Sequence, residues 1–135
     1  MPRLVKGGKW TYGWVVIGQD GEIVVPPEAW AEYGFQEGSE AVFLLGSRTS
    51  GGFAIGTPDS IATVAGKTRA HVQRELSRSR FGNRRVLAPR ETAVKRGDRL
   101  LTVRGSRCGL GFAARGPIYL KALEHPELEV FGEGQ

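Results

Sequence analysis

The chain has little of several residue types on which common kinds of protein depend. Its single cysteine, Cys108, excludes a disulfide framework, so we expect a reducing compartment, the cytoplasm. Its two histidines, His71 and His125, have no cysteine, aspartate or second histidine at ligand spacing, which predicts that no metal is bound. No apolar run is long enough for a signal peptide or a membrane span, so we expect a soluble protein with no membrane partner.

Motifs typical of catalysis are also missing. Residues 65–68, AGKT, look like the end of a phosphate-binding loop, but the glycine that such a loop requires is replaced by Ile61. The sequence has no paired carboxylates, no serine elbow and no dinucleotide fingerprint. We therefore expect a protein that is not an enzyme and uses no cofactor.

What the chain has is a repeat. Residues 46–61, GSRTSGGFAIGTPDSI, resemble residues 105–120, GSRCGLGFAARGPIYL, which lie 59 positions later. Gly38 and Gly97 match at the same offset. A repeated unit usually cannot bury its apolar face alone. We therefore expect residues 1–135 to form one compact domain of two halves related by a pseudo-twofold axis. Repeat one would span residues 10–66 and repeat two residues 76–131.

The spacing of turn-forming residues predicts mainly short strands. Asp20-Gly21 between residues 14–17 and 22–25 indicates a hairpin, and a short helix follows over residues 28–33 between Pro27 and Gly34. Further strands are expected at residues 40–45 and 53–55. The second repeat would supply strands at 98–103 and 111–114, a short helix at 117–123 and an edge strand within 127–131.

The segment between the repeats has two interpretations. Thr57-Pro58-Asp59 reads as a helix start, and the residues behind it place an apolar face and a basic face on one helix. This pattern predicts a basic helical segment over residues 67–80 that links the repeats. Alignment of residues 84–89, RRVLAP, with residues 22–27, EIVVPP, instead makes residues 76–81 the first strand of repeat two. The sequence leaves both open.

Charge is placed unevenly along the chain. Residues 1–66 hold four Lys/Arg against seven Asp/Glu, whereas residues 67–135 hold fifteen against seven. A basic half of this size favours an anionic partner, double-stranded DNA first. The predicted phosphate contacts are Arg78, Arg80, Arg84, Arg85 and Arg90, which cluster where the second hairpin is expected.

Residues 14–55 resemble the swapped-hairpin DNA-binding domains of the AbrB, SpoVT and MazE type. The resemblance is carried by residues 17–26, IGQDGEIVVP, and 32–39, EYGFQEGS, and in repeat two by VLAP at 86–89 and KRGD at 95–98. The tandem arrangement also looks like the MraZ proteins. The resemblance implies an interleaved β-barrel, and it implies DNA binding, commonly as a dimer. Repeat one departs from the family's pattern because it has Glu22, Glu28 and Glu32 where arginine is common.

The sequence therefore predicts a swapped-hairpin, AbrB-like β-barrel that acts as a transcriptional regulator and binds DNA through its second repeat. A homodimer is a further expectation. The alternative is a non-enzymatic module on the same fold that has lost DNA binding and binds a protein or a small anion, with an antitoxin-like role as one form of it. The glycine loops at 46–52 and 105–111 could be anion-binding nests, but we favour structural turns.

Overall fold

We describe the fold from a computed structural model, which covers residues 3–4, 9–46, 51–60, 75–104 and 109–132. Strands account for most of its regular structure, and this confirms the prediction of a mainly β protein. The strands are β1 (Arg3–Leu4), β2 (Lys9–Val16), β3 (Glu22–Val24), β4 (Glu40–Leu45), β5 (Phe53–Gly56), β6 (Glu75–Arg80), β7 (Arg85–Leu87), β8 (Arg99–Val103), β9 (Leu110–Ala113) and β10 (Val130–Gly132). The helices are α1 (Pro27–Tyr33), α3 (Pro117–Ala122) and a single 3₁₀ turn, η3 (Arg90–Thr92).

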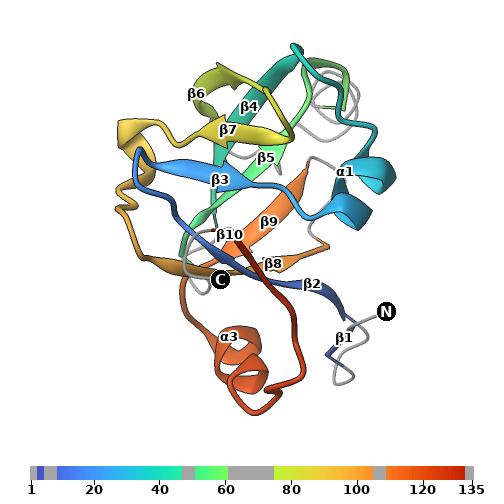
Figure 1. Ribbon diagram of the computed structural model, residues 1–135, viewed down its shortest axis with the longest axis vertical. Helices are drawn as coiled ribbons and strands as arrows, with labels where there is room; N and C mark the ends of the chain where they lie inside the picture. Colours follow the sequence, from blue (N-terminus) through green and yellow to red (C-terminus); the bar gives the residue numbers. More distant parts are fainter. Residues whose placement is uncertain (1–2, 5–8, 47–50, 61–74, 105–108, 133–135) are drawn as a thin grey trace.

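The strands form one large sheet and one small one. The large sheet has the order β1-β2-β8-β9-β5-β4-β6, with β10 beside β2 in parallel, and β3 and β7 form a separate antiparallel ribbon that crosses its front (Figure 1). The expectation of a closed barrel is wrong, because β1 and β6, the ends of this path, do not pair in the described part of the chain. The other edge of β2 is occupied by β10, and β3 and β7 pair with each other instead of joining the large sheet.

Apart from β1 and β10, which pair with β2, the strand pairing is unchanged when the two halves are exchanged. β2 pairs with β8 as β6 pairs with β4, and the hairpins β4-β5 and β8-β9 meet through β5 and β9. In that last ladder Phe53 is the direct partner of Phe112, the residue that occupies the same position in the other repeat. A pseudo-twofold axis would therefore pass between these two phenylalanines.

Local irregularities recur in the same way. The β2·β8 ladder skips one residue of β2, Tyr12, and the β4·β6 ladder skips one residue of β6, Leu76. The backbone N–H of Gly38 donates to the carbonyl of Phe81 at 2.9 Å, and that of Gly97 donates to Ile17 at 2.9 Å. A bulge is a specific local feature of a strand, so its recurrence at matching positions supports the symmetric description of the two halves.

Residues 75–80 decide between the two interpretations of the linking segment. They form β6, which pairs antiparallel with β4, so the prediction of a helix through residue 80 is wrong and the strand alternative is right for this part. From Ser77 to Arg80 the residues alternate between partly buried and exposed, as expected of an edge strand. The pairing with β4 is what identifies this segment as a strand. Residues 67–74 lie outside the described part of the chain.

The start of the helix predicted at Thr57 is present. The backbone N–H of Ser60 donates to the Thr57 hydroxyl, and the backbone N–H of Thr57 donates to the Ser60 hydroxyl, both at 3.1 Å. This exchange satisfies helix N-terminal donors that would otherwise lack a partner. The remainder of that predicted helix, from residue 61, is outside the described residues.

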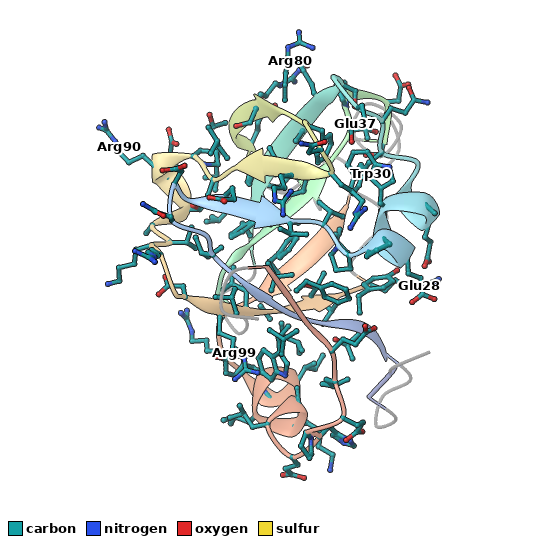
Figure 2. The ribbon with its side chains drawn as sticks, viewed as in Figure 1. Glu28, Trp30, Glu37, Arg80, Arg90 and Arg99 are labelled. Atoms are coloured by element: carbon teal, nitrogen blue, oxygen red, sulfur yellow. The ribbon has the colours of Figure 1, made fainter. Side chains whose placement is uncertain are left out.

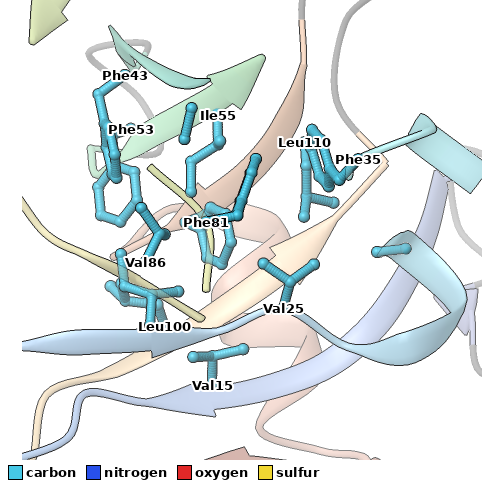
Figure 3. Close-up of a cluster of buried hydrophobic side chains, with 14 of the residues drawn as sticks. Val15, Val25, Phe35, Phe43, Phe53, Ile55, Phe81, Val86, Leu100 and Leu110 are labelled. Atoms are coloured by element: carbon cyan, nitrogen blue, oxygen red, sulfur yellow. The ribbon is translucent and has the colours of Figure 1, made fainter. Parts of the chain in front are cut away.

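The main core lies between the ribbon and the large sheet, and both halves supply it (Figure 3). Phe53 and Phe112 stack with ring centroids 5.0 Å apart, and both are buried. Near α1, Trp30 and Phe35 of the first half pack against Phe81 of the second, whose ring lies 5.0 Å from Trp30 and 4.8 Å from Phe35. Neither half could bury these rings alone.

The two halves differ most after the ribbon. In the first half Pro27 opens the seven-residue helix α1, which ends at Gly34 with φ +69°, a conformation that favours glycine. In the second half, where the chain is three residues shorter, Pro89 leads into the single turn η3. The C-terminal helix α3 covers a second buried cluster on the far side of the large sheet, around Trp14 and Leu101. No helix among the described residues could cross a membrane.

Candidate nucleic-acid interface

The five predicted arginines do not form one surface. Figure 2 shows Arg80 at the top of the molecule and Arg90 at its left edge. Arg78 and Arg80 lie on β6, Arg85 begins β7 and Arg90 begins η3. Their sequence clustering therefore does not translate into a cluster in space.

Arg78 is fully engaged within the molecule. Its guanidinium contacts Glu75 at 2.7 Å and Glu40 at 3.0 Å. The hydrogen bond with Glu75, followed by that with Glu40, raises the pKa of the Arg78 guanidinium, and the same contact lowers the pKa of the Glu75 carboxyl. Two carboxylates therefore neutralise the charge of Arg78, which makes it a weaker phosphate contact even though its side chain is 42% exposed.

Two further arginines are tied to the backbone of the first half. The Arg80 guanidinium donates to the Gly38 carbonyl at 2.7 Å, and Nε of Arg84 donates to the Val25 carbonyl at 3.1 Å. Arg84 also has a left-handed backbone, with φ +59°, and its N–H donates to Glu37 at 2.8 Å. These side chains hold the two halves together, although Arg80 stays exposed.

Arg85 and Arg90 are exposed, and neither makes an ion pair with a residue that the structure describes. Arg85 lines a shallow hollow of about 250 Å³ with Glu22, so a carboxylate shares its surroundings. Arg90 does not line that hollow. Of the five predicted contacts, Arg90 is thus the one best placed for an outside anion.

Three glutamates of the first half face the second half. Glu40 pairs with Arg78, Glu32 pairs with Arg104, and the Glu37 carboxylate accepts the backbone N–H groups of Asn83 at 2.6 Å and Arg84 at 2.8 Å. Glu32 also accepts the hydroxyl of buried Tyr12 at 2.7 Å. The opposite charges of the two halves therefore serve, in part, the contact between them.

Charge is reversed at equivalent positions of the two halves. The repeat alignment pairs a glutamate of the first half with an arginine of the second at four positions, namely Glu22 with Arg84, Glu28 with Arg90, Glu37 with Arg96 and Glu40 with Arg99. In Figure 2 Arg90 lies at the left edge of the molecule and Glu28 at the right edge, whereas Arg99 lies left of the centre and Glu37 right of it.

We define the basic face as Arg90, Lys95, Arg96 and Arg99, all of which are exposed. They lie on η3, on the turn after it and at the start of β8. The sequence interpretation missed the last three as contacts, because it used Lys95-Arg96 only as part of a turn motif. The signal was available, since the segment from 84 to 99 holds six Lys/Arg and the equivalent segment from 22 to 40 holds none.

Arg99 is held in place by an aromatic pair. Its guanidinium carbon lies 4.8 Å from the ring centroid of buried Trp14, and Trp14 meets Tyr119 edge to face at 5.1 Å. The Tyr119 hydroxyl donates to the Arg99 carbonyl at 3.2 Å. A ring face attracts a guanidinium without using its N–H donors, so Arg99 is positioned and still able to bind an anion.

The other candidate features give no site. The described residues include no group of three or more His, Cys, Asp and Glu that could hold a metal ion. Cys108, and residues 47–50 and 105–108 of the glycine loops, lie outside the described part of the chain. Comparisons with protein-family models, with curated proteins and with solved structures found no match to this chain. The AbrB-like resemblance therefore stays a prediction.

Proposed function

We propose that this chain is a non-enzymatic transcriptional regulator of the AbrB-like type, which binds double-stranded DNA through the basic face. The observation that carries the proposal is the charge reversal at equivalent positions of two halves with the same strand pairing. It leaves four exposed cations close together in the chain, and the two that Figure 2 labels, Arg90 and Arg99, lie to the left of Glu28 and Glu37.

Phosphate contact is the chemistry that such a face offers. A protein that neutralises DNA phosphates with Lys and Arg releases condensed counterions, which makes its affinity fall steeply with salt. Four contacts, one from each residue of the basic face, correspond to a slope of log K against log salt of roughly −3 to −4. No base-reading residue is assigned, because phosphate contacts position a protein on DNA without specifying sequence.

The alternative function, a module that binds a protein or a small anion, rested on the acidity of the first half. Glu32, Glu37 and Glu40 now have partners inside the molecule, so their charge is accounted for by the contact between the halves. Three carboxylates of the first half, Asp20, Glu22 and Glu28, make no ion pair with a described residue. They are what remains to support a partner surface. A homodimer is not required either, because one chain supplies both halves.

The test is a salt titration with a mixed-sequence duplex of about 20 base pairs, followed by fluorescence anisotropy between about 50 and 200 mM salt. We expect Arg90→Ala and Lys95→Ala each to lower the magnitude of the slope by about 0.9. Lys121→Ala removes the same charge from α3, outside the basic face, and should leave the slope unchanged. Equal slopes in all three variants would reject the assignment, and no binding at the lowest salt would reject DNA binding itself.

A further inference from the structure

The symmetry of the pairing and the asymmetry of the charge have opposite consequences for DNA. A protein with two equivalent halves presents two equivalent DNA-contacting surfaces, which suit a palindromic site if both reach one duplex and bind two duplexes if they face opposite ways. Here the halves share their strand pairing, but the position of Arg90 is occupied by Glu28 in the first half, and that of Lys95 by Gln36. The shape is nearly twofold and the charge is not.

The first-half surface would repel a duplex. Glu28 is exposed, and a carboxylate placed against phosphate adds a like-charge term where the second half gains an attractive one. Glu37 and Glu40 also carry charge, although each is engaged with the second half. Since Glu28 and Arg90 lie on opposite sides of the molecule, one straight duplex against the basic face stays clear of the acidic side (Figure 2).

We infer that the protein binds DNA on one side only, with one duplex per chain, at a site that need not have twofold symmetry. This inference rests on the proposed function and specifies its substrate, a non-palindromic stretch of duplex contacted by the second half alone. The first half acts as scaffold for the second: Glu37 caps the left-handed turn at residues 83–84, and Glu40 neutralises Arg78.

The sharpest test restores positive charge to the first half. In the double variant Glu28→Arg/Gln36→Lys, both substituted side chains are exposed and make no ion pair or side-chain hydrogen bond with the described residues. The changes copy Arg90 and Lys95 onto their equivalent positions. Glu37 and Glu40 are left alone because they hold the turn and Arg78.

The readout is energy transfer between two populations of a short duplex, one carrying a donor dye and the other an acceptor. We expect no transfer with the wild-type protein, because one chain binds one duplex. The double variant should bridge two duplexes, with transfer that rises and then falls as protein exceeds DNA. Glu124→Arg, a change of similar charge on the exposed end of α3, controls for added charge and should not bridge.

Each outcome decides between the proposals. Bridging by the variant but not by the wild type supports one-sided binding. Bridging by the wild type overturns one-sided binding and leaves the proposed function standing. The same holds for a double variant that binds one duplex more tightly than Glu124→Arg does and never bridges. A folded variant that behaves as the wild type also overturns it, since the halves are then not equivalent surfaces. Absence of wild-type binding removes the proposed function and this inference together.

The reverse change gives a second test that does not depend on a gain of binding. Arg90→Glu should weaken duplex binding about tenfold or more at low salt, because it replaces an attractive phosphate contact with a repulsive one. Adding Glu28→Arg to it should recover binding on the opposite side if the halves are equivalent in shape. A double variant no stronger than Arg90→Glu would contradict that equivalence.

Discussion

Gly52 is the position where the fold makes its sharpest demand on a single residue. It lies just before β5, with φ +63°, and a Cβ built there would come 1.9 Å from the Phe112 carbonyl oxygen. That oxygen cannot move away easily, because Phe112 is buried and pairs with Phe53 at the centre of the large sheet. Gly52→Ala must therefore shift one strand against the other. The equivalent Gly111 lies within β9 without a positive φ, so the expectation concerns Gly52 alone.

The magnitude has two parts. An alanine in the left-handed region costs about 1–2 kcal/mol relative to glycine. Displacing two paired backbone segments adds to this, and we expect a total loss of at least about 3 kcal/mol in the free energy of unfolding. For a chain of this length that loss corresponds to a fall of roughly 10 °C or more in the melting temperature.

Gly34→Ala separates the two parts. Gly34 has nearly the same backbone conformation, φ +69°, but a Cβ built there meets nothing within 4 Å. Gly34→Ala should therefore show the conformational cost alone. The difference between the two variants in the free energy of unfolding, measured in urea, then gives the steric part for Gly52→Ala. If Gly52→Ala is no more destabilising than Gly34→Ala, the close approach of the two strands is not what requires glycine.

Two more substitutions probe the contact between the halves. Phe81→Ala should lower the free energy of unfolding in urea by about 3–5 kcal/mol, because it removes the ring that packs against Trp30 and Phe35. Phe81→Leu should cost clearly less, and equal losses would argue against a packing role. Burial and the hydrogen bond to Glu32 raise the pKa of the Tyr12 hydroxyl, so its contribution is complete below the unfolded-state pKa near 10 and is lost as pH rises toward the folded-state value. Stability of the wild type relative to Tyr12→Phe should therefore decline above about pH 10, and a constant difference would contradict the raised pKa.

Local signals explain which elements the sequence could predict. The chain turns at Asp20-Gly21 as expected, with Gly21 at φ +82°, and α1 starts at a proline and ends at a left-handed glycine. The hairpin predicted around that turn is wrong, because β2 pairs with β8 and β3 pairs with β7 instead of with each other. Strand β4 has the predicted bounds, 40–45. These elements are specified by residues that are neighbours in the chain, so no knowledge of the other half was needed.

Elements that depend on distant partners could not be predicted in the same way. The residues of β6 continue a helical spacing that reaches Leu76, and they also alternate as a strand does. Only the ladder with β4, whose residues lie more than thirty positions earlier, favours the strand. The open sheet has a similar origin: β3 pairs with β7 across the two halves instead of joining the large sheet, and no local motif encodes that choice.

The availability of each arginine could not be predicted from the sequence for the same physical reason. A guanidinium that looks available in the sequence is available in the molecule only if no carboxylate or carbonyl reaches it, and the groups that reach Arg78 and Arg80 come from residues 38 and 40. Local density of arginine located the basic half correctly but not its accessible members. The comparison of equivalent positions, Glu28 with Arg90 or Glu40 with Arg99, was the more informative signal in the sequence.

One pair of equivalent contacts shows how a single chain can separate the roles of its halves. In the first half Glu40 of β4 contacts Arg78 of β6; at the matching positions of the second half, Arg99 of β8 lies over Trp14 of β2. Both contacts join the same two places in the fold, but the ion pair occupies its cation, whereas the ring leaves the N–H groups of Arg99 free to donate. Two identical chains would have to make the same contact twice. A chain with two different halves can use one to hold the structure together and keep the charge of the other for a ligand.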